Sequence, residues 1–197
     1  FMLPCDVEDI ASVDAVFKAL ADRWGSIDFL VHAIGFSDKR ELKGRYADTT
    51  RENFSRTMVI SCFSFTEIAK RAAEIMPRGG SMITLTYGGS TRVMPNYNVM
   101  GVAKAGLEAS VRYLAADFGP QGIRVNALSP GAVRTRAGAG ISDARAMYSF
   151  QRAHSPLRTS VTIENVGGSA LYFLSDLSAG VTGEVHHIDA GYNIISM

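Results

Sequence analysis

Tyr97 and Lys104 are the two residues of this sequence whose types and spacing best suit chemistry. They lie seven residues apart, and a helix brings residues at this spacing to the same face, two turns from each other. A phenol and an ammonium on one face can act on one ligand, and Tyr87, ten residues before Tyr97, adds a second phenol. This combination indicates hydride transfer.

A pair with this spacing also occurs by chance, as a surface lysine near a half-buried tyrosine. The surrounding sequence favours the chemical interpretation. The apolar run Ser81–Thr86 predicts a strand, the turn Gly88-Gly89-Ser90 follows it, and a helix is expected to begin near Tyr97. Open α/β sheets bind their ligands at the carboxyl ends of strands, which is where this arrangement puts the pair.

Short apolar runs alternate with longer segments of helical periodicity along the chain. Strands are predicted at 27–33, 81–86, 123–128 and 184–188, and helices at 9–24, 51–76, 97–118, 142–151 and 163–174. Parallel strands joined by helical crossovers form a layered structure. The sequence therefore predicts an α/β fold with a doubly wound parallel sheet, in a single domain over residues 1–197.

The first residues predict an incomplete start to this fold. Phe1–Val7 has the pattern of a strand end that runs into a loop. Doubly wound nucleotide-binding folds usually open with a strand, a glycine-rich phosphate loop and a helix, and no such loop precedes Asp6. We expect the first β-α-β portion to be missing from this sequence.

Composition argues against several classes of partner. The chain has 197 residues, of which 47% are hydrophobic and 20% charged, and its net charge is +1. This charge gives no reason to expect nucleic acid as a partner, and no run of about 18 apolar residues predicts membrane insertion. Cys5 and Cys62 show neither metal-ligand spacing nor a disulfide pattern. We expect no metal site and a cytoplasmic location.

Motifs along nearly the whole chain resemble those of the short-chain dehydrogenase/reductase superfamily. Besides the Tyr97 and Lys104 pair, they are Asp6-Val7, Val31-His32-Ala33-Ile34-Gly35, Arg124-Val125-Asn126, the run from Ser129 to Thr135, Thr182-Gly183-Glu184 and Asp189-Ala190-Gly191.

Three details are most similar to a divergent branch, the bacterial NADH-dependent enoyl-acyl-carrier-protein reductases. A strand ends in His32-Ala33-Ile34-Gly35-Phe36 instead of Asn-Asn-Ala-Gly. The usual catalytic serine region reads Leu85-Thr86-Tyr87-Gly88-Gly89, and the helix start reads Pro95-Asn96-Tyr97-Asn98. The resemblance implies a Rossmann-like homotetramer that uses NADH to reduce the C2=C3 double bond of enoyl thioesters on acyl-carrier protein.

The resemblance also implies roles for individual residues. Tyr97 would be the catalytic phenol, Tyr87 the second active-site tyrosine, and Lys104 the partner of the nicotinamide ribose. The other expected cofactor-binding residues are Asp6, Val7, Ile34, Val133, Arg134, Thr135, Arg136 and Ala137. The expected substrate-binding residues are Ser37, Tyr87, Tyr97, Met100, Ile141 and Met147.

The chemistry implied by the resemblance explains these residue types. Hydride delivery to C3 moves negative charge onto the thioester oxygen, where a phenol donor would stabilise it. A nearby ammonium would lower the pKa of the phenol. The segment 138–155 is expected to be a helical lid, and Phe36, Met94, Met100, Ile141, Met147, Tyr148 and Phe150 are expected to provide apolar surface for an acyl chain.

Two other interpretations remain open at this point. An ordinary short-chain reductase acting on a 3-oxoacyl thioester or another ketone would use a hydroxyl near Tyr87, for which Thr86 and Ser90 are available. A scaffold or nucleotide-binding protein could keep the fold without catalysis. Glu108 and Asp117 are interpreted as exposed charges on a helix.

Overall fold

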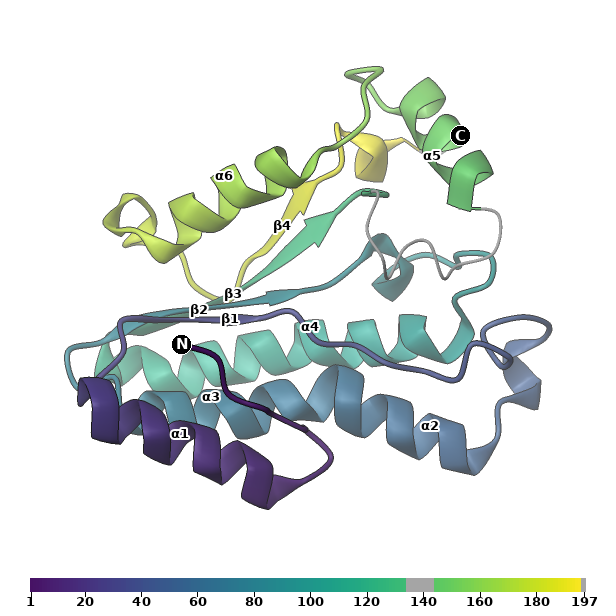
Figure 1. Cartoon of the computed structure of the whole chain (residues 1–197). Helices are drawn as coiled ribbons and strands as arrows, with labels where there is room; N and C mark the ends of the chain where they lie inside the picture. Colours follow the sequence, from purple (N-terminus) through teal and green to yellow (C-terminus); the bar gives the residue numbers. More distant parts are fainter. Residues whose placement is uncertain (134–143, 196–197) are drawn as a thin grey trace.

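The computed structural model describes residues 1–133 and 144–195. Four strands alternate with helices in it (Figure 1). The strands are β1 (Phe29–His32), β2 (Gly80–Leu85), β3 (Ile123–Pro130) and β4 (Val185–Ile188). The α-helices are α1 (Ile10–Trp24), α2 (Arg51–Met58), α3 (Ser64–Glu74), α4 (Asn98–Phe118), α5 (Ala144–His154) and α6 (Ile163–Leu174). Short helical segments are η1 (Tyr46–Asp48), η2 (Val59–Phe63), η3 (Gly88–Ser90), η4 (Gly119–Gln121), η6 (Asp176–Ser178) and η7 (Tyr192–Ile194).

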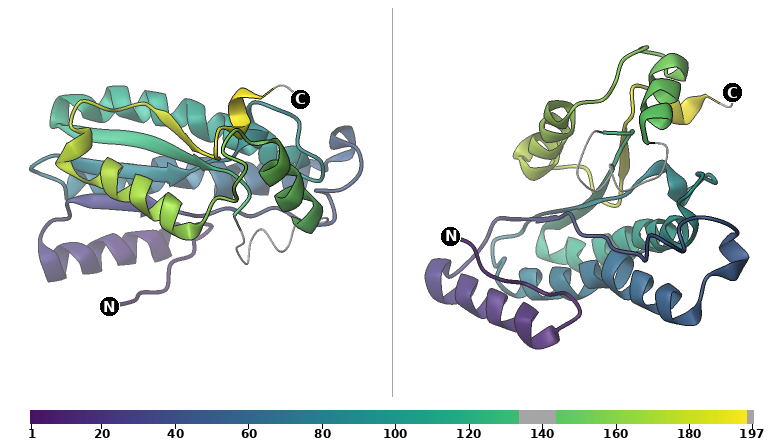
Figure 2. Two further views of the ribbon diagram at one scale, coloured as in Figure 1. Left: turned by 90° about the horizontal axis from the view of Figure 1, so that it is seen from above. Right: turned by 45° about the vertical axis from the view of Figure 1, so that its right-hand side comes forward.

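The strands form a parallel sheet in the order β1-β2-β3-β4. Figures 1 and 2 show α1, α2, α3 and α4 on one face of this sheet and α6 on the other. The predicted doubly wound parallel sheet is therefore confirmed. Because all four strands run in the same direction, the segments that follow them leave the sheet at one edge.

Apolar side chains fill the space on both sides of the sheet. Between the sheet and α3 and α4, the fully buried residues include Phe65, Met82 and Leu107. On the other face, Ile83 and Leu128 pack against Phe173 of α6. Burying a side chain of this size contributes about 1.5–3 kcal/mol, so these contacts fix the helices that carry the site against the sheet.

The first residues differ from the expectation of a strand end. Phe1–Asp6 form no strand in the structure. The Phe1 ring packs edge-on against Trp24, with ring centroids 5.2 Å apart, and the Asp6 backbone N–H donates to Ser12 Oγ at 2.9 Å. The backbone of this segment bonds to the first turn of α1, so the prediction of a strand end is wrong.

The expected helix over 51–76 is real but interrupted. It runs as α2, then a π-helical turn in η2, then α3, which ends at Glu74. Thr50 caps α2, because its side chain accepts a hydrogen bond from the Asn53 N–H. Such π-helical turns are often found beside functional sites. In this turn, Ser61 Oγ forms hydrogen bonds with the backbone N–H and carbonyl oxygen of Phe36, which lines the cavity described below.

Candidate active site

The site is a cavity of about 540 Å³ at the carboxyl edge of the sheet. A volume in this range is typical of sites for small molecules and cofactors. The wall is formed by the segment after β1, the end of β2, the start of α4, the segment after β3, and α5. Its lining residues include Ala33, Ile34, Gly35, Phe36, Ser37, Lys39, Leu42, Leu85, Thr86, Tyr87, Tyr97, Met100, Lys104, Pro130, Ala132, Val133, Met147 and Tyr148.

Most of the described residues expected at the site line this cavity: Ile34, Ser37, Tyr87, Tyr97, Met100, Lys104, Val133 and Met147. Asp6 and Val7 do not. Asp6 is exposed, and Val7 packs with Val13, Ile60 and Ile68 in a cluster that Ile34 also touches. The other expected residues lie outside the described residues: Arg134, Thr135, Arg136, Ala137 and Ile141.

Tyr97 immediately precedes α4, and its ring lies against the turn after β2. Its ring centroid is 5.2 Å from that of Tyr87, in an edge-on arrangement. Burial raises the pKa of Tyr97 well above its ordinary value, and neighbouring Tyr87 raises it further. The expectation of a lowered phenol pKa is therefore wrong for this structure. Tyr97 is a neutral phenol at pH 7 and can donate a hydrogen bond.

Two glycines make room for the Tyr97 ring. A Cβ on Gly89 would lie 2.5 Å from Cδ1 of Tyr97, and a Cβ on Gly101 would lie 2.7 Å from the Gly89 carbonyl oxygen. Real side chains do not tolerate such contacts with ring or backbone atoms. The η3 turn and α4 can therefore approach each other only because both positions lack a side chain.

Lys104 is buried, with only 7% of its surface exposed. Its ammonium donates to the Leu85 carbonyl oxygen at 2.7 Å, and burial lowers its pKa to about 8. An ammonium has three donors, so Lys104 can bind further oxygen acceptors from its place in the cavity wall. This donor set fits the ribose diol of a dinucleotide.

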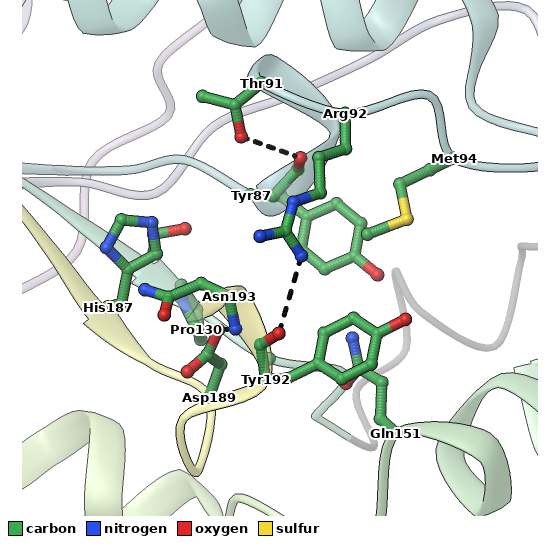
Figure 3. Close-up of a pocket in the computed structure, with 13 residues that line it drawn as sticks. Tyr87, Thr91, Arg92, Met94, Pro130, Gln151, His187, Asp189, Tyr192 and Asn193 are labelled. Carbon is green, nitrogen blue, oxygen red and sulfur yellow. Dashed lines mark hydrogen bonds between the residues drawn. The ribbon is translucent and has the colours of Figure 1, made fainter. Parts of the chain in front are cut away.

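Tyr87 stands between the main cavity and a smaller pocket. Its O–H donates to Sδ of Met147 on α5 at 3.4 Å, and burial raises its pKa to about 12. Figure 3 shows the smaller pocket, with Arg92, Asp189 and Tyr192 around it. It has about 20 Å³ of space, enough for a single water. This smaller pocket is therefore too small for a substrate.

Of the seven side chains expected to face an acyl chain, Ile141 lies outside the described residues, and two of the other six do not line the main cavity. Met94 lines the smaller pocket instead. Phe150 does not line the cavity; its ring stacks on His154, with ring centroids 3.9 Å apart. The described residues of α5 that do line the cavity are Met147 and Tyr148.

Glu108 is buried, which corrects the expectation that it is an exposed helix charge. Only 8% of its surface is exposed, and Oε1 accepts a hydrogen bond from the Thr86 hydroxyl at 2.6 Å. Thr86 lines the cavity, but its hydroxyl is directed to this carboxylate. Thr86 therefore does not offer the carbonyl-binding hydroxyl that an ordinary short-chain reductase would need.

Sequence reasoning missed Lys39 and Leu42 in the cavity wall. They lie in an irregular segment between β1 and α2, where no periodicity indicates which side chains point inward. Within the described residues, no group of three or more His, Cys, Asp or Glu side chains could hold a metal ion. In the same part of the chain, no helix is long and apolar enough to cross a membrane.

Comparisons with known proteins agree with one another. The family profile described as Enoyl-(Acyl carrier protein) reductase matches residues 1–193. A Rhizobium meliloti protein named enoyl-acyl-carrier-protein reductase (NADH) 2 is 78% identical over 197 residues, which are 100% of this chain and 74% of that protein.

Solved structures give the same result. The crystal structure of FabI from Candidatus Liberibacter asiaticus has 57% identity and a TM-score of 0.97, with 100% of this chain and 76% of that chain covered. The reductase of Anaplasma phagocytophilum, solved in complex with NAD, has 55% identity and a TM-score of 0.94, and the match covers 99% of this chain and 72% of that chain. The chain described here belongs to the enoyl-acyl-carrier-protein reductase family of the short-chain dehydrogenase/reductase superfamily.

Proposed function

We propose that this protein uses NADH to reduce the C2=C3 double bond of trans-2-enoyl thioesters carried by acyl-carrier protein in fatty-acid elongation. The observation that carries the proposal is that three groups line one cavity: a neutral Tyr97 phenol, the Tyr87 ring packed against it, and the buried Lys104 ammonium. Membership of the enoyl reductase family supports the same reaction.

Tyr97 is the donor in the proposed mechanism. Bound NADH would supply a hydride to C3 of the enoyl group. The thioester oxygen then gains negative charge, and the Tyr97 O–H stabilises that charge by a hydrogen bond, an effect worth about 3–4 kcal/mol for a single preorganised donor. Protonation of the resulting enolate at C2 by solvent would complete the reduction. A phenol pKa above its ordinary value keeps the proton on Tyr97 until the charge develops.

Several other residues of the chain orient the reactants. Lys104 would hold the ribose hydroxyls through the donors on its cavity side, and the backbone of Val133 would face the nicotinamide. Met100 and Met147 provide apolar surface that excludes water from the acyl chain. We also propose that 138–155 forms a lid; in its described part, Gln151 of α5 accepts the Ala132 N–H at 2.6 Å and so joins α5 to the segment after β3.

The direct test is NADH oxidation by the purified full-length protein with a trans-2-enoyl thioester. Tyr97→Phe removes the donor and should lower kcat/KM by about 10²–10³-fold, the usual loss for one oxyanion donor. Tyr113→Phe is the matched control, because Tyr113 lies on the same helix with 76% of its surface exposed. The control should keep wild-type activity.

Two outcomes would overturn the proposal. Full activity in Tyr97→Phe would show that the phenol is not the donor. Turnover of a 3-oxoacyl thioester with none of the enoyl thioester would assign the protein to the ordinary short-chain reductases.

We further propose that the protein works in the cytoplasm as a homotetramer. Its described surface carries large exposed apolar side chains on α6 and α4, among them Ile163, Leu171 and Val102. Apolar area of this kind is typical of subunit interfaces. Light scattering coupled to size-exclusion chromatography measures the mass, and a monomer at micromolar concentration would contradict the assembly.

A further inference from the structure

The backbone on both sides of Tyr97 has an unusual conformation. Asn96 has φ 58° and Asn98 has φ 32°, both in the left-handed region that residues other than glycine rarely adopt. Asparagine tolerates this region better than most side chains do. Tyr97 therefore lies between two residues with positive φ, and unusual backbone conformations of this kind recur at functional sites.

The Asn98 side chain adds a second constraint. Its Nδ2 lies 3.0 Å from the Glu41 carbonyl oxygen and 3.4 Å from those of Lys43 and Gly44. Carbonyl oxygens only accept hydrogen bonds, so the end of the amide that faces them is the NH₂ group. One side chain next to Tyr97 thus holds three backbone positions of a distant segment, which we call the 38–44 loop.

The 38–44 loop forms part of the main cavity. Lys39 and Leu42 line the cavity wall. The loop is also fixed to α2, because the Glu41 carboxylate accepts hydrogen bonds from the Thr50 N–H at 2.9 Å and the Thr50 hydroxyl at 2.8 Å. The side chain of Glu41 therefore anchors the loop to α2, and its backbone anchors it to Asn98.

We propose that Asn98 is a positioning residue that joins the backbone at Tyr97 to the 38–44 loop. It thereby sets the width of the main cavity where the acyl chain would bind. The left-handed backbone of Asn98 orients Tyr97, and its amide holds the loop that carries Leu42. The substrate class in this inference rests on the proposed function. The attachment of the loop by the Asn98 amide does not.

Substitutions at Asn98 can separate its two contributions. Asn98→Gly removes the side-chain amide, but glycine adopts positive φ readily. Asn98→Ala also removes the amide, and alanine adopts positive φ only at a cost. Asn98→Asp keeps the side-chain shape but replaces the NH₂ donor with an oxygen that repels the three carbonyls. Asn96→Gly is the matched control, because Asn96 also has positive φ and lies equally close to Tyr97 along the chain.

Steady-state kinetics with short and long enoyl thioesters give the first readout. Asn98→Gly and Asn98→Asp should raise KM for the long thioester by about three- to tenfold, the range expected for lost hydrogen bonds, with a smaller change in kcat. Asn98→Ala should in addition lower kcat, because strain at φ 32° would displace Tyr97. The Asn96→Gly control should behave as wild type.

Hydrogen exchange of the 38–44 loop gives a readout that does not depend on activity. Its backbone amides should exchange faster in Asn98→Gly and Asn98→Asp than in wild type and in Asn96→Gly. Unchanged exchange together with unchanged KM in both Asn98 variants would overturn the inference. If wild type reduced no enoyl thioester at all, the proposed function would fail, while the exchange result would still decide whether Asn98 holds the loop.

Discussion

At the scale of single residues, the site depends on what Tyr97 touches as much as on its phenol. Its ring occupies space that a side chain at Gly89 would fill, and burial keeps its proton in place. Lys104 stays within reach of the cavity because its ammonium is anchored on the Leu85 carbonyl. Gly89 therefore determines where the phenol ring can lie, and the Leu85 carbonyl determines where the ammonium lies.

Gly89→Ala should damage catalysis through Tyr97. The new Cβ would lie 2.5 Å from Cδ1 of the ring, so the ring or the η3 turn must move. We expect kcat/KM to fall by at least about tenfold, because small displacements of a catalytic group are costly. Gly88→Ala is the control, since its Cβ would meet Cε of Met94 at an ordinary 3.5 Å. Equal activities of the two variants would contradict this account.

At the scale of elements, a second side-chain hydrogen bond joins the end of β2 to α4, besides the bond from Lys104 to the Leu85 carbonyl. The Thr86 hydroxyl follows β2, and Glu108 lies on α4 one turn beyond Lys104, so the bond fixes the two elements that carry Tyr87 and Tyr97. A buried carboxylate requires such a partner, because its charge is otherwise poorly stabilised. The bond thus serves both the stability of the fold and the alignment of the two tyrosines.

Thr86→Val should destabilise the protein by about 1.5–3 kcal/mol, because it leaves the buried Glu108 carboxylate without its donor. Thr86→Ser keeps the hydroxyl and should recover most of the loss. The double variant Thr86→Val with Glu108→Leu removes both partners and should be less destabilised than Thr86→Val alone. Urea unfolding monitored by circular dichroism measures these free energies. Additive effects of the two substitutions would rule out the coupling.

The bounds of the strands and helices show which parts of the fold could be predicted from the sequence alone. Apolar runs predicted all four described strands to within two residues of their ends, since strands of a parallel sheet are rich in apolar residues. The π-helical turn at Val59–Phe63 could not be predicted, because it changes hydrogen bonding without changing composition. The burial of Glu108 was missed for a related reason: its partner, Thr86, lies 22 residues away in the sequence.

At the scale of the whole molecule, His32 joins the sheet to the helical layer. At the end of β1, Nδ1 lies 2.9 Å from Oγ1 of Thr84 on β2, and Nε2 lies 3.0 Å from Oγ of Ser64 on α3. The Ser64 hydroxyl donates to the Ile60 carbonyl, so its oxygen is free to accept from Nε2–H of a neutral ring. Burial, with the charge of Lys104, lowers the pKa of His32 to about 4.

His32 should make stability depend on pH between about 6.5 and 4. Its pKa is lower in the folded state, so the unfolded chain takes up the proton first as pH falls. The contribution of His32 to the free energy of unfolding is therefore fully present above pH 6.5. It is lost as the pH falls towards 4, by about 3 kcal/mol in total. Urea unfolding between pH 4 and 8 should show a smaller loss in His32→Gln than in wild type. Parallel curves for the two proteins would contradict the assignment.

The π-helical turn also keeps two parts of a long helix in phase. Asn53, Thr57, Ser61, Phe65 and Ala69 are all buried and recur every four residues. An α-helix turns about 100° per residue, so positions four apart drift by about 40° at every step. The wider turn at Val59–Phe63 counteracts this drift. Asn53 and Thr57 can therefore face Ser37 in the cavity wall. Phe65 and Ala69, further along, face the sheet. With a regular α-helical pitch, the same helix could not contact the cavity wall and the sheet at these positions together.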